Sequence, residues 1–262
     1  MPDSFYAGRT VLVTGASSGI GAAMARHLGT RGARVLLVAR REAALEAVAR
    51  DVRAAGGEAV VLEADLEPPG AAQKLVDRVH GADEAVDVLV NNAGFGIRGP
   101  VLEAKPDALE GMVTLNVLAL TVLTRLLLPG MVDRGRGGVL NVASIAAFTP
   151  APQFAVYSAT KAYVQSFSEA LWAELDGSGV HCTCLCPGPV ATEFGNRAGV
   201  GEGFFTSGLP AQAVARDGLK ALARGRRRVV PGLWNKVQTA ATRFVPPSVT
   251  IKTAQAIMRR AG

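Results

Sequence analysis

The sequence predicts an α/β fold: a doubly wound, seven-stranded parallel sheet with helices on both faces, formed by a single domain over residues 1–262. Short β-branched runs alternate with alanine-rich segments of helix length, which is the pattern of repeated βα units. Most of these runs are apolar at every position, as strands are when helices cover both faces of their sheet. The 262 residues, 49% of them hydrophobic, suit one large domain better than two ordinary ones.

The predicted elements follow one another at regular intervals. The strands are expected at residues 10–14, 34–39, 59–63, 86–91, 138–142, 180–186 and 228–230, from the runs TVLVT, RVLLVA, AVVLE, VDVLVN, GVLNV, VHCTCLC and RVV. The helices are expected between them, at residues 20–30, 42–55, 71–79, 108–132, 156–175 and 211–223. Because crossovers between parallel strands are right-handed, the carboxyl ends of the strands should meet along one edge, where ligands bind.

Residues 231–262 follow the last predicted strand and are expected to form a C-terminal helical extension. The first segment carries apolar side chains at helical spacing, at Leu233, Trp234, Val237 and Ala241. Pro246 and Pro247 then interrupt the chain, and Ser248 is expected to cap a second amphipathic helix. The two helices could close an apolar pocket, mediate contact between subunits, pack on the core, or rest peripherally on a membrane through basic side chains. These basic residues are Lys236, Arg243, Lys252 and Arg259.

The charge and the N-terminus bear on partners and location. A net charge of +6 would allow attraction to nucleic acid, and a local basic run occupies Arg224, Arg226, Arg227 and Arg228. No aromatic residues interleave with these arginines, so a solvated helix end is favoured and no nucleic-acid partner is expected. The first ten residues do not resemble a secretory signal, and no stretch holds eighteen uninterrupted apolar residues. We therefore expect a soluble, cytoplasmic protein.

The cysteines and histidines predict no metal site. Cys182, Cys184 and Cys186 alternate along one predicted strand and so share one of its faces. No histidine or fourth cysteine completes a metal site beside them, so buried packing is the favoured role. The three histidines are scattered, and neither Gly-x-Ser-x-Gly nor His-Glu-x-x-His occurs.

A glycine-rich turn, TGASSGIG at residues 14–21, joins the first predicted strand to the first helix. Gly15, Gly19 and Gly21 allow the backbone to turn tightly and to approach a pyrophosphate. The N-terminus of the helix offers unpaired N–H groups and a partial positive charge to the same anion. A glycine trio at the first strand-to-helix junction therefore predicts a Rossmann-type dinucleotide site.

The glycine spacing, Gly-x-x-x-Gly-x-Gly, resembles that of the short-chain dehydrogenase/reductase family. Further elements match that family in order, and the resemblance extends over residues 10–192. These elements are Asp65-Leu66, Asn91-Asn92-Ala93-Gly94, Asn116, Ser144, Tyr157 with Lys161, and Pro187-Gly188-Pro189-Val190-Ala191-Thr192. The resemblance implies an oxidoreductase that interconverts a small-molecule ketone or aldehyde and an alcohol by hydride transfer with a nicotinamide cofactor. The expected assembly is a homodimer or homotetramer.

The end of the second predicted strand bears on the choice between NAD and NADP, because that loop reaches the adenosine ribose. Ala39 stands where the NAD-using members of the family place an acid, and Arg40 follows it. A guanidinium can hold a 2′-phosphate bidentately, and alanine removes the carboxylate that would repel the phosphate. An exposed pair at the start of a helix would explain Arg40 and Arg41 but not the missing acid. NADP(H) is therefore the expected cofactor.

The resemblance implies the remaining cofactor contacts. Asp65 and Leu66 would meet the adenine edge, and the backbone of residues 92–94 would pass along the adenosine. Residues 187–192 would border the nicotinamide and the diphosphate. The predicted cofactor-binding set is Gly15, Ser17, Ser18, Gly19, Ile20, Gly21, Arg40, Asp65, Leu66, Asn92, Ala93, Gly94, Tyr157, Lys161, Pro187, Gly188, Val190 and Thr192.

Tyr157 and Lys161 lie four residues apart in a predicted helix, so their side chains share one face. A phenol is a poor base at neutral pH, but a nearby ammonium and an oxidised nicotinamide both lower its pKa. Tyr157 is therefore the expected catalytic acid/base, which protonates the developing alkoxide as hydride arrives. By the resemblance, Ser144 would hold the substrate carbonyl oxygen, and Asn116 would support a water that connects Lys161 to solvent.

The substrate is expected to meet residues 193–210 and the C-terminal extension, which the resemblance covers poorly. The glycines of residues 193–210 indicate a mobile lid. Phe194, Phe204 and Phe205 indicate an apolar substrate, bulky or lipid-like, or else they pack the loop against the core. Two alternatives remain, a reductase of 3-oxoacyl thioesters and a non-catalytic dinucleotide-binding regulator. The intact set of Ser144, Tyr157, Lys161 and Asn116 argues against the regulator.

Overall fold

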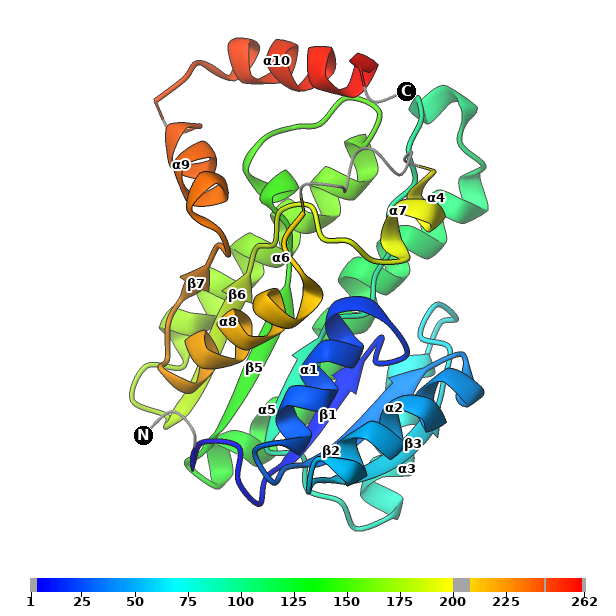
Figure 1. Cartoon of the computed structure of the whole chain (residues 1–262), viewed down its shortest axis with the longest axis vertical. Coiled ribbons are helices and arrows are strands. Elements are labelled where there is room, and N and C mark those ends of the chain that lie inside the picture. Colours follow the sequence, from blue (N-terminus) through cyan, green and yellow to red (C-terminus); the bar gives the residue numbers. More distant parts are fainter. Residues whose placement is uncertain (1–3, 200–207, 243, 261–262) are drawn as a thin grey trace.

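The computed structural model describes residues 4–199, 208–242 and 244–260. Its centre is one seven-stranded sheet in the order β3-β2-β1-β4-β5-β6-β7, and every pairing is parallel (Figure 1). The strands are β1 (Thr10–Thr14), β2 (Arg34–Ala39), β3 (Glu58–Glu63), β4 (Val88–Asn91), β5 (Gly137–Val142), β6 (Val180–Leu185) and β7 (Arg228–Val229). The predicted fold is confirmed, and the predicted strands lie within two residues of the observed ones.

Helices cover both faces of the sheet (Figure 1). One layer consists of α1 (Gly19–Gly29), α2 (Glu42–Ala54) and α8 (Ala211–Ala223), and the other of α3 (Ala71–Gly81), α5 (Leu120–Asp133) and α6 (Ala155–Glu174). Alternate strand residues point to opposite faces. Val11 and Val13 of β1 therefore enter the core under α1, whereas Leu12 enters the core under α5.

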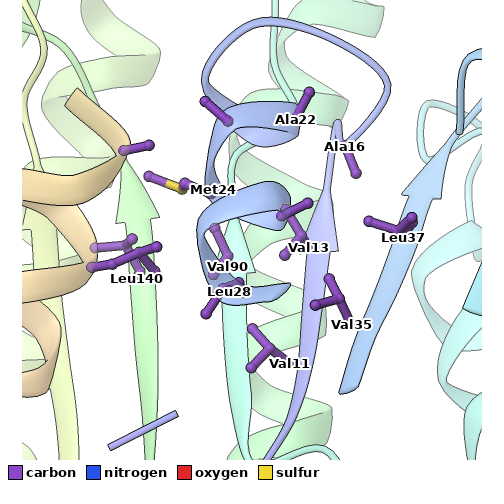
Figure 2. Packing of buried hydrophobic residues seen from close by; sticks show 14 of the residues in the cluster. Val11, Val13, Ala16, Ala22, Met24, Leu28, Val35, Leu37, Val90 and Leu140 are labelled. Carbon is purple, nitrogen blue, oxygen red and sulfur yellow. The ribbon is translucent and has the colours of Figure 1, made fainter. Parts of the chain in front are cut away.

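Figure 2 shows how the first of these cores holds α1 on the sheet. Met24 and Leu28 of α1 are fully buried in this core together with Val13 of β1, and the Met24 side chain points toward α8. Val35 and Leu37 of the neighbouring β2 extend the same apolar layer. Because this packing fixes the direction of α1, it also fixes where the N-terminus of α1 points, which is toward the carboxyl edge of the sheet (Figure 1).

The strand order reverses between β1 and β4, and this reversal positions the site. The connections after β1 and after β4 run to opposite sides, so a crevice opens at the carboxyl ends of the two strands. The glycine turn follows β1, and residues 92–94 follow β4. Both segments therefore meet at this crevice.

The prediction of one continuous helix over residues 108–132 is wrong. The structure divides the stretch into α4 (Pro106–Val113), a π-helix (Thr114–Ala119) and α5. The wider π turn holds Asn116, whose side chain bonds the backbone of Phe95 at both its N–H and its C=O. Within the described residues, Pro106–Asp133 is the one helical stretch with the length and composition of a membrane span, and Leu123, Leu127 and Met131 bury its inner side in the second core.

The C-terminal extension forms two helices, α9 (Leu233–Ala241) and α10 (Pro247–Arg260), as expected. The expected cap is wrong, because α10 begins one residue before Ser248, at Pro247. Proline suits a first helical position, where its missing N–H costs no hydrogen bond. The short helix α7 (Phe194–Ala198) opens the predicted lid, and residues 200–207, with Phe204 and Phe205, lie outside the described residues.

Candidate active site

A cavity of about 1480 Å³ opens at the carboxyl edge of the sheet. Its wall runs from the glycine turn, past the ends of β2, β4, β5 and β6, to α9 and α10. The predicted residues in its wall are Gly15, Ser17, Ser18, Gly19, Ile20, Arg40, Asp65, Leu66, Asn92, Ala93, Gly94, Ser144, Tyr157, Lys161, Pro187, Gly188, Val190 and Thr192. Gly21 and Asn116 are the two predicted residues outside the wall.

The glycine turn is shaped by contact with the segment after β4. Gly15 has a φ of +65°, and a Cβ on it would lie 2.8 Å from Nδ2 of Asn92. That amide group donates to the carbonyl oxygens of Thr14 and Gly15, at 2.9 and 3.2 Å. A Cβ on Gly21 would collide with the Gly15 carbonyl, so Gly21 permits the first turn of α1 to pack on the strand end.

The N-terminus of α1 fits a diphosphate. Ser18 precedes the helix in an extended conformation, and its side chain makes no capping hydrogen bond. Gly19 and Ile20 line the cavity, so the first N–H groups of the helix lie at the wall. A helix start of this kind binds anionic oxygens through N–H groups and through the helix dipole.

The end of β2 carries two arginines with acidic partners that the sequence reasoning missed. Arg40 donates to Glu67 at 2.9 Å and lies 3.7 Å from Asp65. Arg41 donates to Glu193 at 2.7 Å and to Ser17 Oγ at 3.5 Å. Arg40 and Arg41 are both substantially exposed, and both line the cavity. The end of the crevice beside β2 therefore holds two guanidinium groups at the cavity wall.

Ser144, Tyr157 and Lys161 meet on the opposite part of the wall. Ser144 follows β5, and its Oγ accepts a hydrogen bond from the N–H of Ala146 at 3.1 Å. Tyr157 and Lys161 lie one turn apart on α6, as predicted, and both line the cavity together with Ser144. Lys161 Nζ donates to the carbonyl oxygen of Val142 at 2.9 Å and lies 5.8 Å from the centre of the Tyr157 ring.

Burial dominates the proton affinities of this pair. Burial raises the pKa of Tyr157 to about 12, although the hydrogen bond with Ser144 lowers it. The direction differs from the lowering that the sequence spacing predicts, because the loss of water costs the phenolate more than nearby groups return. Burial also lowers the pKa of Lys161 to about 8. At neutral pH, the site therefore holds a protonated phenol beside an ammonium that readily gives up its proton.

Asn116 lies behind this part of the wall. It is buried, and its Nδ2 donates to Phe95 O at 2.9 Å and to Thr160 Oγ1 at 3.1 Å. A Cβ on Gly94 would lie 2.8 Å from Asn116 Oδ1 and 3.4 Å from Lys161 Nζ. Gly94 therefore brings the strand end close to both polar groups, and Asn116 fixes the backbone that surrounds Lys161.

The far part of the cavity is lined by aromatic side chains. Phe154 and Phe194 flank Tyr157, with ring centres at 5.8 and 5.5 Å. Phe148 and Trp234 line the wall further out. The cysteines take no part in it, since Cys182, Cys184 and Cys186 are free and buried in the sheet. Across the described residues, no three His, Cys, Asp or Glu side chains gather in a way that could hold a metal.

Comparison with known proteins places these features in a family. A model of the short chain dehydrogenase family matches residues 9–202. The chain is 40% identical over 191 residues to a short chain dehydrogenase of Pseudocercospora fijiensis, which covers 72% of this chain and 62% of the relative. It is 38% identical over 184 residues to the ketoacyl reductase HetN of Nostoc sp., covering 70% and 64%. The chain thus spans less than two thirds of the length of these relatives.

Solved structures share the fold over nearly the whole chain. A short-chain dehydrogenase from Sphingobium yanoikuyae in complex with NADPH has a TM-score of 0.81 and 32% identity, covering 90% of this chain and 94% of that one. A short-chain dehydrogenase/reductase from Burkholderia phymatum in complex with NAD has a TM-score of 0.82 and 27% identity, covering 90% of this chain and 93% of that one. The bulky-bulky ketone specific alcohol dehydrogenase from Comamonas testosteroni has a TM-score of 0.76 and 26% identity, covering 90% of this chain and 93% of that one.

The matched residues include the parts of the crevice described above. The glycine turn, the segment after β4, Ser144, and the pair on α6 all lie within residues 9–202. The seven-stranded parallel sheet that carries them is shared with the solved structures. From the family model, the relatives and the fold together, this chain belongs to the short-chain dehydrogenase family.

Proposed function

We propose that this chain is an NADP(H)-dependent oxidoreductase that interconverts a ketone or aldehyde and an alcohol. The observation that carries the proposal is the gathering of Ser144, Tyr157 and Lys161 in one wall of the crevice, with Lys161 one helical turn from Tyr157. A protein that only bound a dinucleotide would have no use for a phenol, a hydroxyl and a buried ammonium in the wall of one cavity. The same arrangement therefore disfavours the non-catalytic regulator.

In the proposed reduction, each side chain of the site has one task. The bound nicotinamide supplies the hydride. Ser144 donates a hydrogen bond to the substrate carbonyl oxygen and fixes its position. Tyr157, protonated at neutral pH because its pKa is about 12, gives its proton to that oxygen as negative charge develops. Lys161, with a pKa of about 8, returns a proton to the phenol, and Asn116 supports the water that links Lys161 to solvent.

Two features at the adenosine end support NADP(H) as the cofactor. Ala39 lines the cavity where a carboxylate would repel a phosphate, and Arg40 lies beside it. A 2′-phosphate competes with Glu67 and Asp65 for the Arg40 guanidinium, and phosphate accepts bidentate pairs well. The family itself does not decide this choice, because similar structures carry NADPH in one case and NAD in another.

The aromatic far wall supports a bulky, apolar carbonyl substrate. Phe154, Phe194 and Trp234 surround the space beyond Tyr157, and α9 and α10 close it. Apolar walls with few polar groups bind substrates through burial of apolar area. The similarity to a bulky-bulky ketone specific alcohol dehydrogenase points in the same direction.

A second candidate is a reductase of 3-oxoacyl thioesters, which the similarity to the ketoacyl reductase HetN favours. The two candidates differ in what the enzyme needs besides the carbonyl. A thioester reductase should turn over a 3-oxoacyl pantetheine thioester. It should lose that turnover when the substrate is replaced by the free 3-oxo acid or by a simple ester of the acid. Turnover of unconjugated bulky ketones establishes the general reductase.

A panel of ketones and aldehydes run with NADPH and with NADH tests the proposal, with the loss of absorbance of the reduced cofactor as the measurement. We expect faster oxidation of NADPH with bulky apolar ketones than with small polar ones, and slower oxidation of NADH throughout. Binding of NADPH without oxidation by any carbonyl compound would contradict the proposal and restore the regulator.

The proposed setting is cytoplasmic, and the proposed assembly is a homodimer or homotetramer. One helix face supports assembly. Leu118 of the π-helix and Tyr163 of α6 are large apolar side chains left exposed. Tyr163 stacks on Phe167 at 5.9 Å and is hydrogen-bonded to Thr121 at 3.0 Å, so it is held in place on that face. A second copy would remove this face from water.

A further inference from the structure

The C-terminal arm, which comprises α9, the connection after it and α10, carries two sets of side chains. One set lines the cavity and includes Leu233, Trp234, Gln238, Thr242, Thr250 and Thr253. The outer surface of the arm consists of Lys236, Val237, Phe244, Val249 and Lys252, which are exposed and do not line the cavity. In Figure 1, α9 and α10 form the outermost layer at the carboxyl end of the sheet.

The outer surface exposes large apolar side chains. The exposed fractions are 52% for Val237, 87% for Phe244 and 50% for Val249. Three large apolar side chains on one arm therefore remain in contact with water. Covering them with another surface would be favourable, because it removes apolar area from water. None of the three lines the cavity, so the cavity does not cover them.

The positive charge of the arm indicates what kind of partner covers this surface. Residues 231–262 contain five Lys and Arg and no Asp or Glu, so this stretch carries +5 of the formal charge of +6 of the chain. Lys236 and Lys252 are exposed beside the apolar side chains. Helices that combine a basic face with exposed aromatic and aliphatic residues bind the interface of anionic bilayers, where the apolar groups enter the acyl boundary and the lysines meet the lipid phosphates.

We propose that the outer surface of the arm docks this chain peripherally on an anionic lipid bilayer. Residues of the arm form part of the cavity wall, so docking through the arm places the cavity near the membrane. If the proposed function holds, an apolar ketone then passes from the lipid to the site beneath the arm without crossing water. The docking itself does not depend on that function.

The test uses the full chain and vesicles of two compositions, phosphatidylcholine alone and phosphatidylcholine with phosphatidylglycerol. Sedimentation with the vesicles is measured with no substrate present. We expect binding to the vesicles that contain phosphatidylglycerol, weakened by salt, and little binding to phosphatidylcholine alone. Equal binding to both compositions, or to neither, would overturn the proposal.

Matched variants locate the binding surface. The pair Lys236→Gln and Lys252→Gln should weaken vesicle binding by about tenfold or more, since each lysine near a charged surface contributes to attraction. The control pair Arg224→Gln and Arg226→Gln removes the same charge from exposed positions at the end of α8 and should change binding little. An equal loss in both pairs would show that net charge alone drives binding, which contradicts docking through the arm.

Two variants that replace apolar residues distinguish insertion of apolar side chains into the bilayer from attraction between charges. Val249→Ser should weaken binding, whereas Val132→Ser, at an exposed position on α5, should not. Sedimentation velocity without lipid identifies the competing occupant, a second copy of this chain. If Val249→Ser dissolves an oligomer, the outer surface is an interface between copies and the proposal fails. A chain that binds vesicles but reduces no ketone would refute the proposed function and leave the docking intact.

Discussion

Tyr157 shows how one residue depends on its burial. Its ring is packed between Phe154 and Phe194, and loss of water raises the pKa of the phenol to about 12, so the neutral form is favoured. A neutral phenol is the form that reduction needs, since the oxygen of the carbonyl gains negative charge as hydride arrives. Oxidation of the alcohol needs the phenolate, so the same burial disfavours that direction at neutral pH.

Tyr157→Phe is expected to reduce turnover by about a hundredfold or more, because it removes the proton donor and retains the ring. NADPH binding, measured by fluorescence titration, should change little. Tyr163→Phe is the matched control on the same helix, since Tyr163 faces outward and should retain full turnover. Near-normal turnover of Tyr157→Phe would remove this residue from the mechanism.

Lys161 should give the site a pH limit. Its pKa in the folded chain, about 8, lies below its ordinary value of 10.5, so it loses its proton near pH 8. If the ammonium supplies the proton, kcat/KM for reduction should be highest below pH 8 and fall above it. The pH profile of kcat/KM is the measurement. Lys161→Arg should shift the falling limb upward, because a guanidinium keeps its charge, and a limb unmoved by that change would assign it to another group.

Arg40→Ala should erode the preference for NADPH over NADH, because a charge-assisted hydrogen bond to the 2′-phosphate contributes about 1.5 to 3 kcal/mol. The ratio of kcat/KM for the two cofactors is the measurement. Arg50→Ala, on the exposed side of α2 and away from the cavity, is the control for charge alone. Equal use of NADPH and NADH by the unaltered chain would refute the interpretation of the end of β2.

At the scale of elements, the C-terminal arm adds nothing to the sheet, yet it closes the cavity. Trp234 lines the cavity from α9, while Asn235 lies against Gly188 and bonds the carbonyl oxygen of Pro231. The seven strands and their two cores are complete without these residues. Substrate closure and folding are therefore carried by different elements.

Truncation after Pro231 should leave a folded chain that has lost activity on long-chain or polycyclic ketones. Activity on small ketones should decline less, because the wall around Tyr157 stays in place. Trp234→Ala tests the same wall within the full chain, and Trp172→Ala, on the outside of α6, is its control. Unchanged turnover of bulky ketones by a folded truncated chain would show that the arm forms no part of the substrate site.

At the scale of the molecule, assembly should depend on the face that carries Leu118 and Tyr163. Leu118→Glu should shift the sedimentation coefficient toward that of the monomer, because a carboxylate at a buried interface loses its hydration without a partner. Leu102→Glu is the control, since Leu102 is more exposed and lies outside this face. A monomer in the unaltered chain would contradict the proposed assembly.

The sheet was predictable from the sequence, because each apolar β-branched run is bounded by turn residues and no residue far away is needed to recognise it. The π-helix that divides residues 108–132 was not predictable, because the sequence of this stretch stays apolar and typical of a helix throughout. The partners of the two arginines were also missed. Arg40 and Glu67 lie 27 residues apart and Arg41 and Glu193 lie 152 apart, so only the folded chain brings them together.

The pair of Arg41 and Glu193 has a consequence for attempts to redesign this enzyme. Arg41 directly precedes α2 in the wall of the cavity, and Glu193 directly precedes α7, which carries Phe194 to the side of Tyr157. The bond between them ties the end of the crevice beside β2 to the segment that carries Phe194. Exchanging Arg41 would therefore also release a contact of the segment that carries Phe194. Under the proposed function, a change at Arg41 bears on the cofactor and on the substrate wall together.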